Sequence, residues 1–161
     1  MNPRIAVCCL AVVLAACSGV PLDAPRDAAS AGSQRALETT ADATSTATSL
    51  AAYKHDLANR IAQTNSTQVF IGRPQPLLRS VVVLRYHVDA SGRLMRSDIM
   101  RSNRDRAAEN IALATLRKSA PFPKPAPQLL RGGRVEILET WLFNNDGRFQ
   151  LRTIAEPQRD E

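Results

Sequence analysis

The chain has 161 residues and a net charge of +6, with 21 Lys and Arg against 15 Asp and Glu. This length suits a single domain, and the three cysteines exclude a disulfide-rich fold because two of them lie in the apolar start of the chain. The positive charge belongs to one segment, since residues 73–134 carry 13 Lys and Arg against 4 Asp and Glu.

The start of the chain has the order of a bacterial export signal. Arg4 precedes an uncharged stretch, residues 5–16, which ends in Leu-Ala-Ala directly before Cys17. A basic start, a short apolar helix and small residues at the cleavage point define a signal peptide. The Leu-Ala-Ala-Cys segment also resembles the lipobox of bacterial lipoproteins. We therefore expect residues 1–16 to be a lipoprotein signal peptide and Cys17 to carry the lipid.

Two alternatives to this interpretation are a retained membrane anchor and an ordinary signal peptide with an incidental cysteine. The twelve apolar residues 5–16 span only about 18 Å as a helix, against ~30 Å of hydrocarbon, which argues against an anchor. Ser18, in place of an aspartate, resembles outer-membrane rather than inner-membrane lipoproteins. We expect an outer-membrane lipoprotein that faces the periplasm.

Residues 17–49 are predicted to form the lipidated cysteine and a disordered tether, because they consist mainly of Ala, Ser, Thr, Asp and Gly. As a flexible coil this tether has an end-to-end distance on the order of 30 Å, enough to hold a domain off a membrane surface. Residues 155–161 are predicted to be a disordered tail. The folded domain is expected over residues 50–154.

The domain is predicted to begin with a helix over residues 50–64, which Ser49 would cap. Its apolar stripe at helical spacing consists of Leu50, Tyr53, Leu57, Ile61 and Thr64.

A strand over Val81–Val88 follows, with Val82, Leu84, Tyr86 and Val88 on one face. The polar turn Asp89–Gly92 then indicates a hairpin. The return strand, residues 93–101, breaks the strict alternation between Leu94 and Ile99, which indicates a bulge.

The second helix is expected to begin at Ser102 or Asn103, with Asp105 in its first turn, and to end near Ser119. Four prolines then stiffen residues 120–127 and direct Phe122 to a fixed place. A third strand, Val135–Phe143, and a fourth, Arg148–Ile154, flank an Asp-Gly turn. This order predicts an α+β fold, a small antiparallel sheet of three to four strands with two helices on one face.

In this order, the helix, the hairpin, the alanine-rich helix and the proline-rich exit resemble the C-terminal domain shared by the TonB and TolA cell-envelope proteins. The Pro-Phe-Pro-Lys-Pro run, residues 121–125, is similar to TolA in particular. The resemblance covers about residues 50–154. It implies a docking domain that binds envelope proteins, to whose sheet edge a partner adds a strand, and a link to TonB- or Tol-type transport or envelope integrity.

By this resemblance the third strand is the first candidate for binding a partner. Trp141, the only tryptophan, has two interpretations: an anchor in the interface or a half-buried sheet residue beneath the helices. The candidate partner-binding residues are Val135, Ile137, Glu139, Trp141 and Phe143.

The resemblance has departures. TonB and TolA proper carry an inner-membrane helix and a long spacer. We expect neither in this chain, and therefore a detached docking domain, monomeric or weakly dimeric. The alternative within the binding class is a true energy transducer that retains its apolar start as an anchor.

The sequence nominates no catalytic, metal or cofactor site. His55 and His87 are predicted to be solvated or at an edge, and neither lies in a metal-ligand spacing or beside a nucleophile. The remaining alternative is a periplasmic enzyme or inhibitor without a recognisable site. Few aromatic residues and export argue against nucleic acid as a ligand of the basic segment. That segment either attracts lipopolysaccharide, anionic lipid or an acidic partner, or solvates the outer faces of the hairpin and helix.

Overall fold

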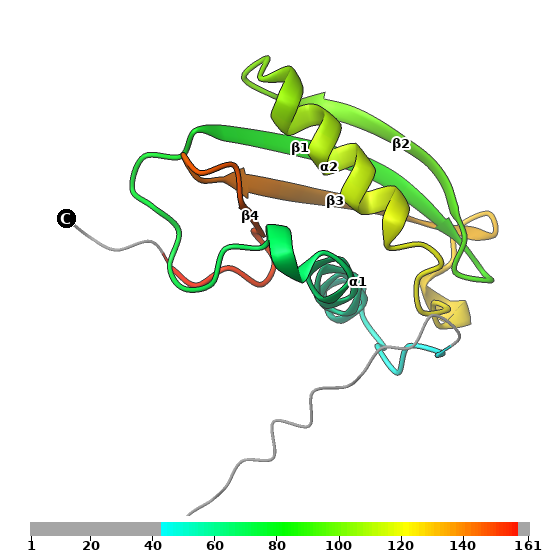
Figure 1. Cartoon of the computed structure of the whole chain (residues 1–161). Coiled ribbons are helices and arrows are strands. Elements are labelled where there is room, and N and C mark those ends of the chain that lie inside the picture. Colours follow the sequence, from blue (N-terminus) through cyan, green and yellow to red (C-terminus); the bar gives the residue numbers. More distant parts are fainter. Residues whose placement is uncertain (1–42, 158–161) are drawn as a thin grey trace, which may run out of the picture. The chain divides into compact units, whose positions relative to one another are not determined.

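The computed structural model describes residues 43–157, which form two helices and a four-stranded antiparallel sheet with strand order β2-β1-β3-β4 (Figure 1). This confirms the predicted α+β class. The elements are α1 (Leu50–Thr64), the 3-10 helix η1 (Ser66–Gln68), β1 (Ser80–Asp89), β2 (Leu94–Arg101), α2 (Arg106–Lys118), the 3-10 helix η2 (Pro127–Leu129), β3 (Arg134–Phe143) and β4 (Phe149–Leu151). The predicted signal peptide, Cys17, most of the tether and the end of the tail lie outside the described residues.

Helix α1 has the predicted bounds and the predicted cap. The Oγ of Ser49 accepts a hydrogen bond from the N–H of Ala52 at 3.2 Å, which satisfies one of the free donors of the first turn. Most of the predicted stripe is buried, although Leu50, in the first turn, is half exposed. The buried residues of α1 are Tyr53, Leu57, Ala58 and Ile61.

Helix α2 begins later than predicted. Its cap is Asp105, whose Oδ1 accepts the N–H of Ala108 at 3.1 Å, so the prediction of Ser102 or Asn103 was wrong. Those two side chains have other partners: Ser102 donates to the carboxylate of Glu109, and Asn103 accepts from Ser80 at 2.5 Å. The bond of Ser102 therefore joins the residues before α2 to the first turn of α2, and the bond of Asn103 joins the same residues to β1.

In the sheet, β1 alternates between buried and half-buried residues along its whole length. The inward face was predicted correctly and consists of Val82, Leu84, Tyr86 and Val88. The register of β2 against β1 shifts twice, at Met95 and at Met100. The first shift is the predicted bulge and the second was not predicted.

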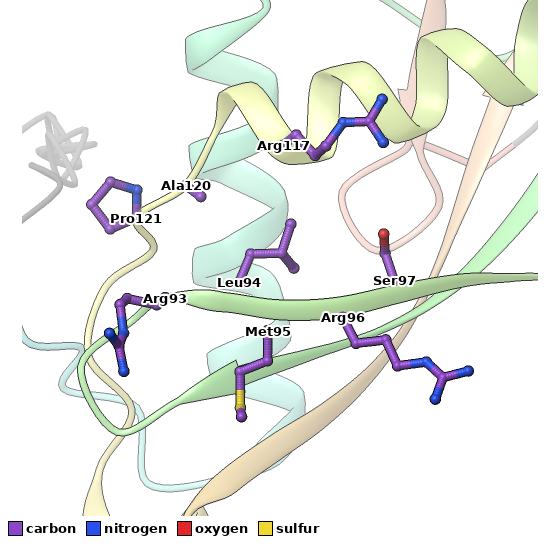
Figure 2. Close-up of a pocket in the computed structure, with 8 residues that line it drawn as sticks. All are labelled: Arg93, Leu94, Met95, Arg96, Ser97, Arg117, Ala120 and Pro121. Carbon is purple, nitrogen blue, oxygen red and sulfur yellow. The ribbon is translucent and has the colours of Figure 1, made fainter.

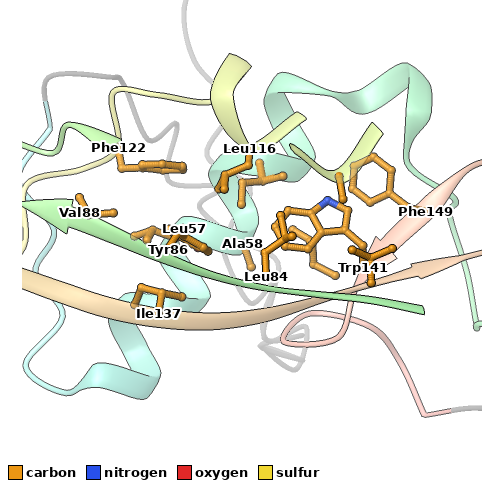
Figure 3. Packing of buried hydrophobic residues seen from close by; sticks show 14 of the residues in the cluster. Leu57, Ala58, Leu84, Tyr86, Val88, Leu116, Phe122, Ile137, Trp141 and Phe149 are labelled. Carbon is orange, nitrogen blue, oxygen red and sulfur yellow. The ribbon is translucent and has the colours of Figure 1, made fainter. Parts of the chain in front are cut away.

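The core lies between the two helices and one face of the sheet (Figure 3). Trp141 of β3 is its largest member and is fully buried. The proline-rich loop after α2 directs Phe122 into this core, as predicted, where its ring stacks on that of Tyr86 with centroids 5.9 Å apart. The other face of the sheet carries half-buried and exposed side chains.

The hairpin between β1 and β2 is held against the proline-rich loop. The N–H of Phe122 donates to the carbonyl of Gly92 at 2.7 Å. Gly92 has φ +85°, and a Cβ added there would lie 2.0 Å from the carbonyl oxygen of Phe122. Only glycine permits this conformation at so close an approach.

The ordered chain extends seven residues ahead of α1, into the region that composition assigned to the tether. Ala43 and Ser45 pair with Lys124 through two backbone hydrogen bonds of 3.0 and 2.9 Å, and the Oγ of Ser45 donates to Asp56 at 2.5 Å. Composition does not reveal such a contact because the backbone supplies two of its three hydrogen bonds.

Candidate protein interface

The five predicted partner-binding residues lie together on one face of β3, and that face points into the core. Each has 2% or less of its surface exposed: Val135, Ile137, Glu139, Trp141 and Phe143. The indole of Trp141 also donates from Nε1 to the Oγ1 of Thr115 at 3.2 Å. The four apolar side chains belong to the core, and a partner that binds the folded surface of β3 contacts other groups of this strand.

The backbone of β3 is only partly paired. On one side, β3 pairs with β1 over its full length, Arg134–Phe143. On the other side, β4 pairs only with Trp141–Phe143. Arg134 forms an isolated bridge with Arg131, and no other described strand pairs with Val135–Glu139 on this side, which we call the β3 free edge.

The direction of the backbone groups at the β3 free edge follows from one hydrogen bond. The carbonyl of Thr140 faces the β4 side, because it accepts the N–H of Arg152 at 2.9 Å. Backbone groups alternate between the two sides of an antiparallel strand. The N–H and C=O groups of Glu136 and Leu138 therefore face the open side, and the side chain of Leu138 is 53% exposed.

A buried carboxylate lies behind this edge. The Oε1 of Glu139 accepts the N–H of Thr140 at 2.7 Å and lies 4.0 Å from the Nζ of Lys54 on α1. Burial, followed by the charge of Glu139, raises the pKa of the Tyr86 hydroxyl well above its ordinary value. The sequence already contained a signal for this inward position, since Glu139 alternates with the apolar Ile137 and Trp141.

His55 is exposed, as predicted, whereas His87 lies in the central strand β1 and is half-buried, so the prediction of an edge position was wrong. His87 is on the face of β1 away from the helices, with Nε2 3.1 Å from the Oε2 of Glu136. His55 is exposed on α1, where its ring nitrogen lies 3.1 Å from the amide of Asn59. Within residues 43–157, no group of three or more His, Cys, Asp or Glu is placed to hold a metal ion.

The sequence interpretation missed a second open edge, that of β2. Strand order makes β2 the outermost strand, and among the described residues only β1 pairs with it. Met95, Ile99 and Met100 are 58%, 39% and 48% exposed. Three large apolar residues in a strand of irregular alternation were the available signal for a surface that is only partly covered.

Comparison with known proteins gives one distant relative. The chain is 28% identical over 71 residues to Protein TonB of Pseudomonas putida. This chain is distantly similar to TonB. The match covers 44% of the chain and 29% of that TonB protein, so it spans less than a third of its relative.

The similarity to TonB supports a TonB-like domain. No protein-family model matches the chain, and no solved structure matches it. In the part of the chain that the structure describes, neither helix is long and apolar enough to cross a membrane.

Proposed function

We propose that this chain is a non-enzymatic lipoprotein of the bacterial cell envelope whose TonB-like domain binds extended segments of envelope proteins. The proposed binding site is the β3 free edge. The observation that carries the proposal is the open side of β3 at Glu136 and Leu138, whose outward backbone groups have no strand partner among the described residues, in a chain similar to TonB. The lipid on Cys17 would hold the domain at the periplasmic face of the outer membrane.

The β3 free edge has the chemistry for adding a strand. Glu136 and Leu138 each offer one N–H donor and one C=O acceptor to the open side, and a partner backbone satisfies these without a strict side-chain code. Five residues of strand extend about 17 Å, which limits the partner segment to a short stretch. The exposed Leu138 adds an apolar contact on the outer face.

The similarity to TonB supports the cell envelope as the place where this domain acts. It favours a protein that works through protein–protein contacts in the envelope, in TonB- or Tol-type transport or envelope integrity. Because the matched region is short, the partner is defined only by its chemistry: an extended segment that leaves its own backbone free to pair.

Crosslinking in intact cell envelopes tests the β3 free edge. A photoreactive amino acid at Glu136 should capture an envelope protein, and Leu138→Pro should abolish that capture. The N–H of Leu138 faces away from β1, so its loss leaves the β1–β3 hydrogen bonds in place.

Ser97→Pro is the matched control, because it introduces a proline on the outer side of the opposite edge strand, β2. Thermal unfolding of both variants verifies that the domain remains folded. Capture that persists at full yield in folded Leu138→Pro protein would exclude the β3 free edge as the docking site.

A further inference from the structure

A groove lies along the open edge of β2, away from the β3 free edge. The groove has a volume of about 640 Å³ and lies between β2, the C-terminal end of α2 and the loop that follows it (Figure 2). We call it the β2 groove, and its lining residues are Arg93, Leu94, Met95, Arg96, Ser97, Arg117, Ala120 and Pro121.

The inner part of the β2 groove is largely apolar. Figure 2 shows the side chain of Leu94 pointing from β2 towards α2, with Ala120 and Pro121 at the end of the groove. Leu94 packs against the core from a partly buried position, so a side chain entering from the edge meets an existing apolar surface. An aliphatic side chain fits this position.

The rim of the β2 groove is basic. It carries Arg93, Arg96 and Arg117 and no acidic residue. Arg93 and Arg96 pair with carboxylates of their own hairpin at 2.8 and 2.9 Å. Arg117 is exposed, and no ion pair joins it to another residue of the described domain. Arg117, on the α2 side of the groove, is therefore the charge of the rim that complements a negatively charged ligand.

The backbone of β2 offers hydrogen bonds to the same ligand. The N–H of Asp89 donates to Arg93 of the return strand, so odd-numbered residues of β1 direct their backbone groups towards β2. Ser97 and Ile99 lie opposite the even-numbered Tyr86 and Leu84. Ser97 and Ile99 therefore direct their own N–H and C=O groups outward.

We infer that the β2 groove binds an extended acidic segment of a partner protein, which adds to the sheet as a strand beside β2. Its backbone pairs with Ser97 and Ile99, an aliphatic side chain packs on Leu94, and a carboxylate lies beside Arg117. This interface is separate from the β3 free edge, because β2 and β3 lie on opposite sides of β1.

Charge favours an acidic segment over a second copy of this chain at the same edge. Two β2 edges placed side by side would bring two sets of Arg93, Arg96 and Arg117 together, and like charges across an interface oppose association. An acidic strand places opposite charges there and forms the same backbone hydrogen bonds.

Fluorescence anisotropy with the full chain tests this inference. The probe is a labelled ten-residue peptide of alternating Glu and Val. The control peptide has Lys in place of each Glu. We expect the Glu peptide to bind at least tenfold more tightly than the Lys peptide, with the largest amide chemical-shift changes at Ser97 and Ile99.

Two variants and two controls separate the contribution of the β2 backbone to peptide binding from that of the Arg117 charge. Ser97→Pro should abolish binding of the Glu peptide, and Arg117→Glu should weaken it about tenfold. Arg152→Glu makes the same charge change at an exposed position outside the groove and should alter affinity less than about twofold. Leu138→Pro, which blocks the β3 free edge, should leave binding of the Glu peptide unchanged.

Several results would overturn the inference: equal affinity for the two peptides, full binding by folded Ser97→Pro protein, or loss of binding in Leu138→Pro protein. Self-association that Ser97→Pro abolishes would assign the edge to a second copy. Binding to phosphatidylglycerol vesicles that Arg117→Glu abolishes, without peptide binding, would assign the rim to a membrane. None of these outcomes affects crosslinking from position 136. The β3 free edge and the β2 groove are therefore tested independently.

Discussion

The Nε1 of Trp141 and the Oγ1 of Thr115 lie 3.2 Å apart, and their hydrogen bond joins the middle of the sheet to α2 inside the core. The same hydroxyl donates to helix carbonyls, those of Ile111 at 2.8 Å and Ala112 at 3.0 Å. Its position is therefore fixed by α2, and the indole docks on a prearranged acceptor.

Replacement of Thr115 by valine keeps the shape of the side chain and removes this acceptor. The buried indole N–H is then left without a partner, and we expect the free energy of unfolding to fall by about 1–3 kcal/mol. Urea unfolding followed by the fluorescence of the single tryptophan measures the change. Thr115→Ser retains the hydroxyl and should lose less; equal losses in the two variants would remove the hydrogen bond as the cause.

The two tyrosines of the chain predict a loss of stability at alkaline pH. Both are fully buried, and burial raises the pKa of Tyr53 and of Tyr86 well above the ordinary value. In the unfolded chain they ionise near pH ~10. The unfolded state therefore binds fewer protons above that pH, and stability falls as pH rises through it.

A pH titration checks this prediction directly, because the chain has no exposed tyrosine to obscure the signal. Tyrosinate absorbance should appear only together with the circular dichroism change of unfolding. Tyr53→Phe, which removes the hydroxyl that donates to the carbonyl of Pro123 at 2.8 Å, should halve the final tyrosinate signal. Tyrosinate absorbance in the folded protein near pH ~10 would contradict the raised pKa values.

Gly92→Ala should destabilise the domain far more than Gly133→Ala. The two glycines have similar positive φ values, +85° and +77°, but only Gly92 would place a Cβ against the carbonyl of Phe122. Backbone strain alone costs on the order of 1 kcal/mol, which is our expectation for Gly133→Ala. For Gly92→Ala we expect a loss of ~3 kcal/mol or more because the proline-rich loop must also shift. Chemical denaturation compares the two, and equal losses would exclude the close contact as the cause.

The lipoprotein proposal predicts that Cys17→Ser protein incorporates no labelled fatty acid and stays in the uncleaved form. Lipid attachment requires the thiol, and in bacterial lipoproteins cleavage follows attachment. Metabolic labelling and the apparent mass of the protein report both steps. A Cys8→Ser variant is the control, since that cysteine lies within the predicted signal peptide and its loss should leave labelling intact. Label in Cys17→Ser protein would reject the anchor.

Local patterns predicted most of the architecture because they depend on residue spacing. The alternation of Val82, Leu84, Tyr86 and Val88 specifies a strand with one buried face, and all four are buried. Residue spacing also predicted the apolar stripe of α1 and its cap at Ser49. The cap of α2 could not be predicted in this way, since Ser102, Asn103 and Asp105 can each cap a helix. The choice depends on the bonds of Asn103 to Ser80, in β1, and of Ser102 to Glu109, in α2 itself.

The interface was harder to predict because the alternation of β3 does not state which of its two faces meets the helices. The residues of β3 were proposed from the resemblance to TonB and TolA, although Glu139 stands among the apolar residues that form its inward face. The structure buries that carboxylate beside Lys54 and leaves the apolar Leu138 exposed. Strand order, which opens the edge of β2 and part of β3, depends on long-range pairing that no local pattern contains.

The contact of Ala43 and Ser45 with Lys124 has a mechanical consequence. A pull on the chain ahead of Ala43 loads two backbone hydrogen bonds first, before any force reaches the cap of α1 or the sheet. Detaching residues 43–45 would break these bonds and the hydrogen bond of Ser45 to Asp56, and would stop short of Ala47, which belongs to the core. Under tension, this segment would therefore detach before the sheet is loaded, and both open strand edges would keep their structure.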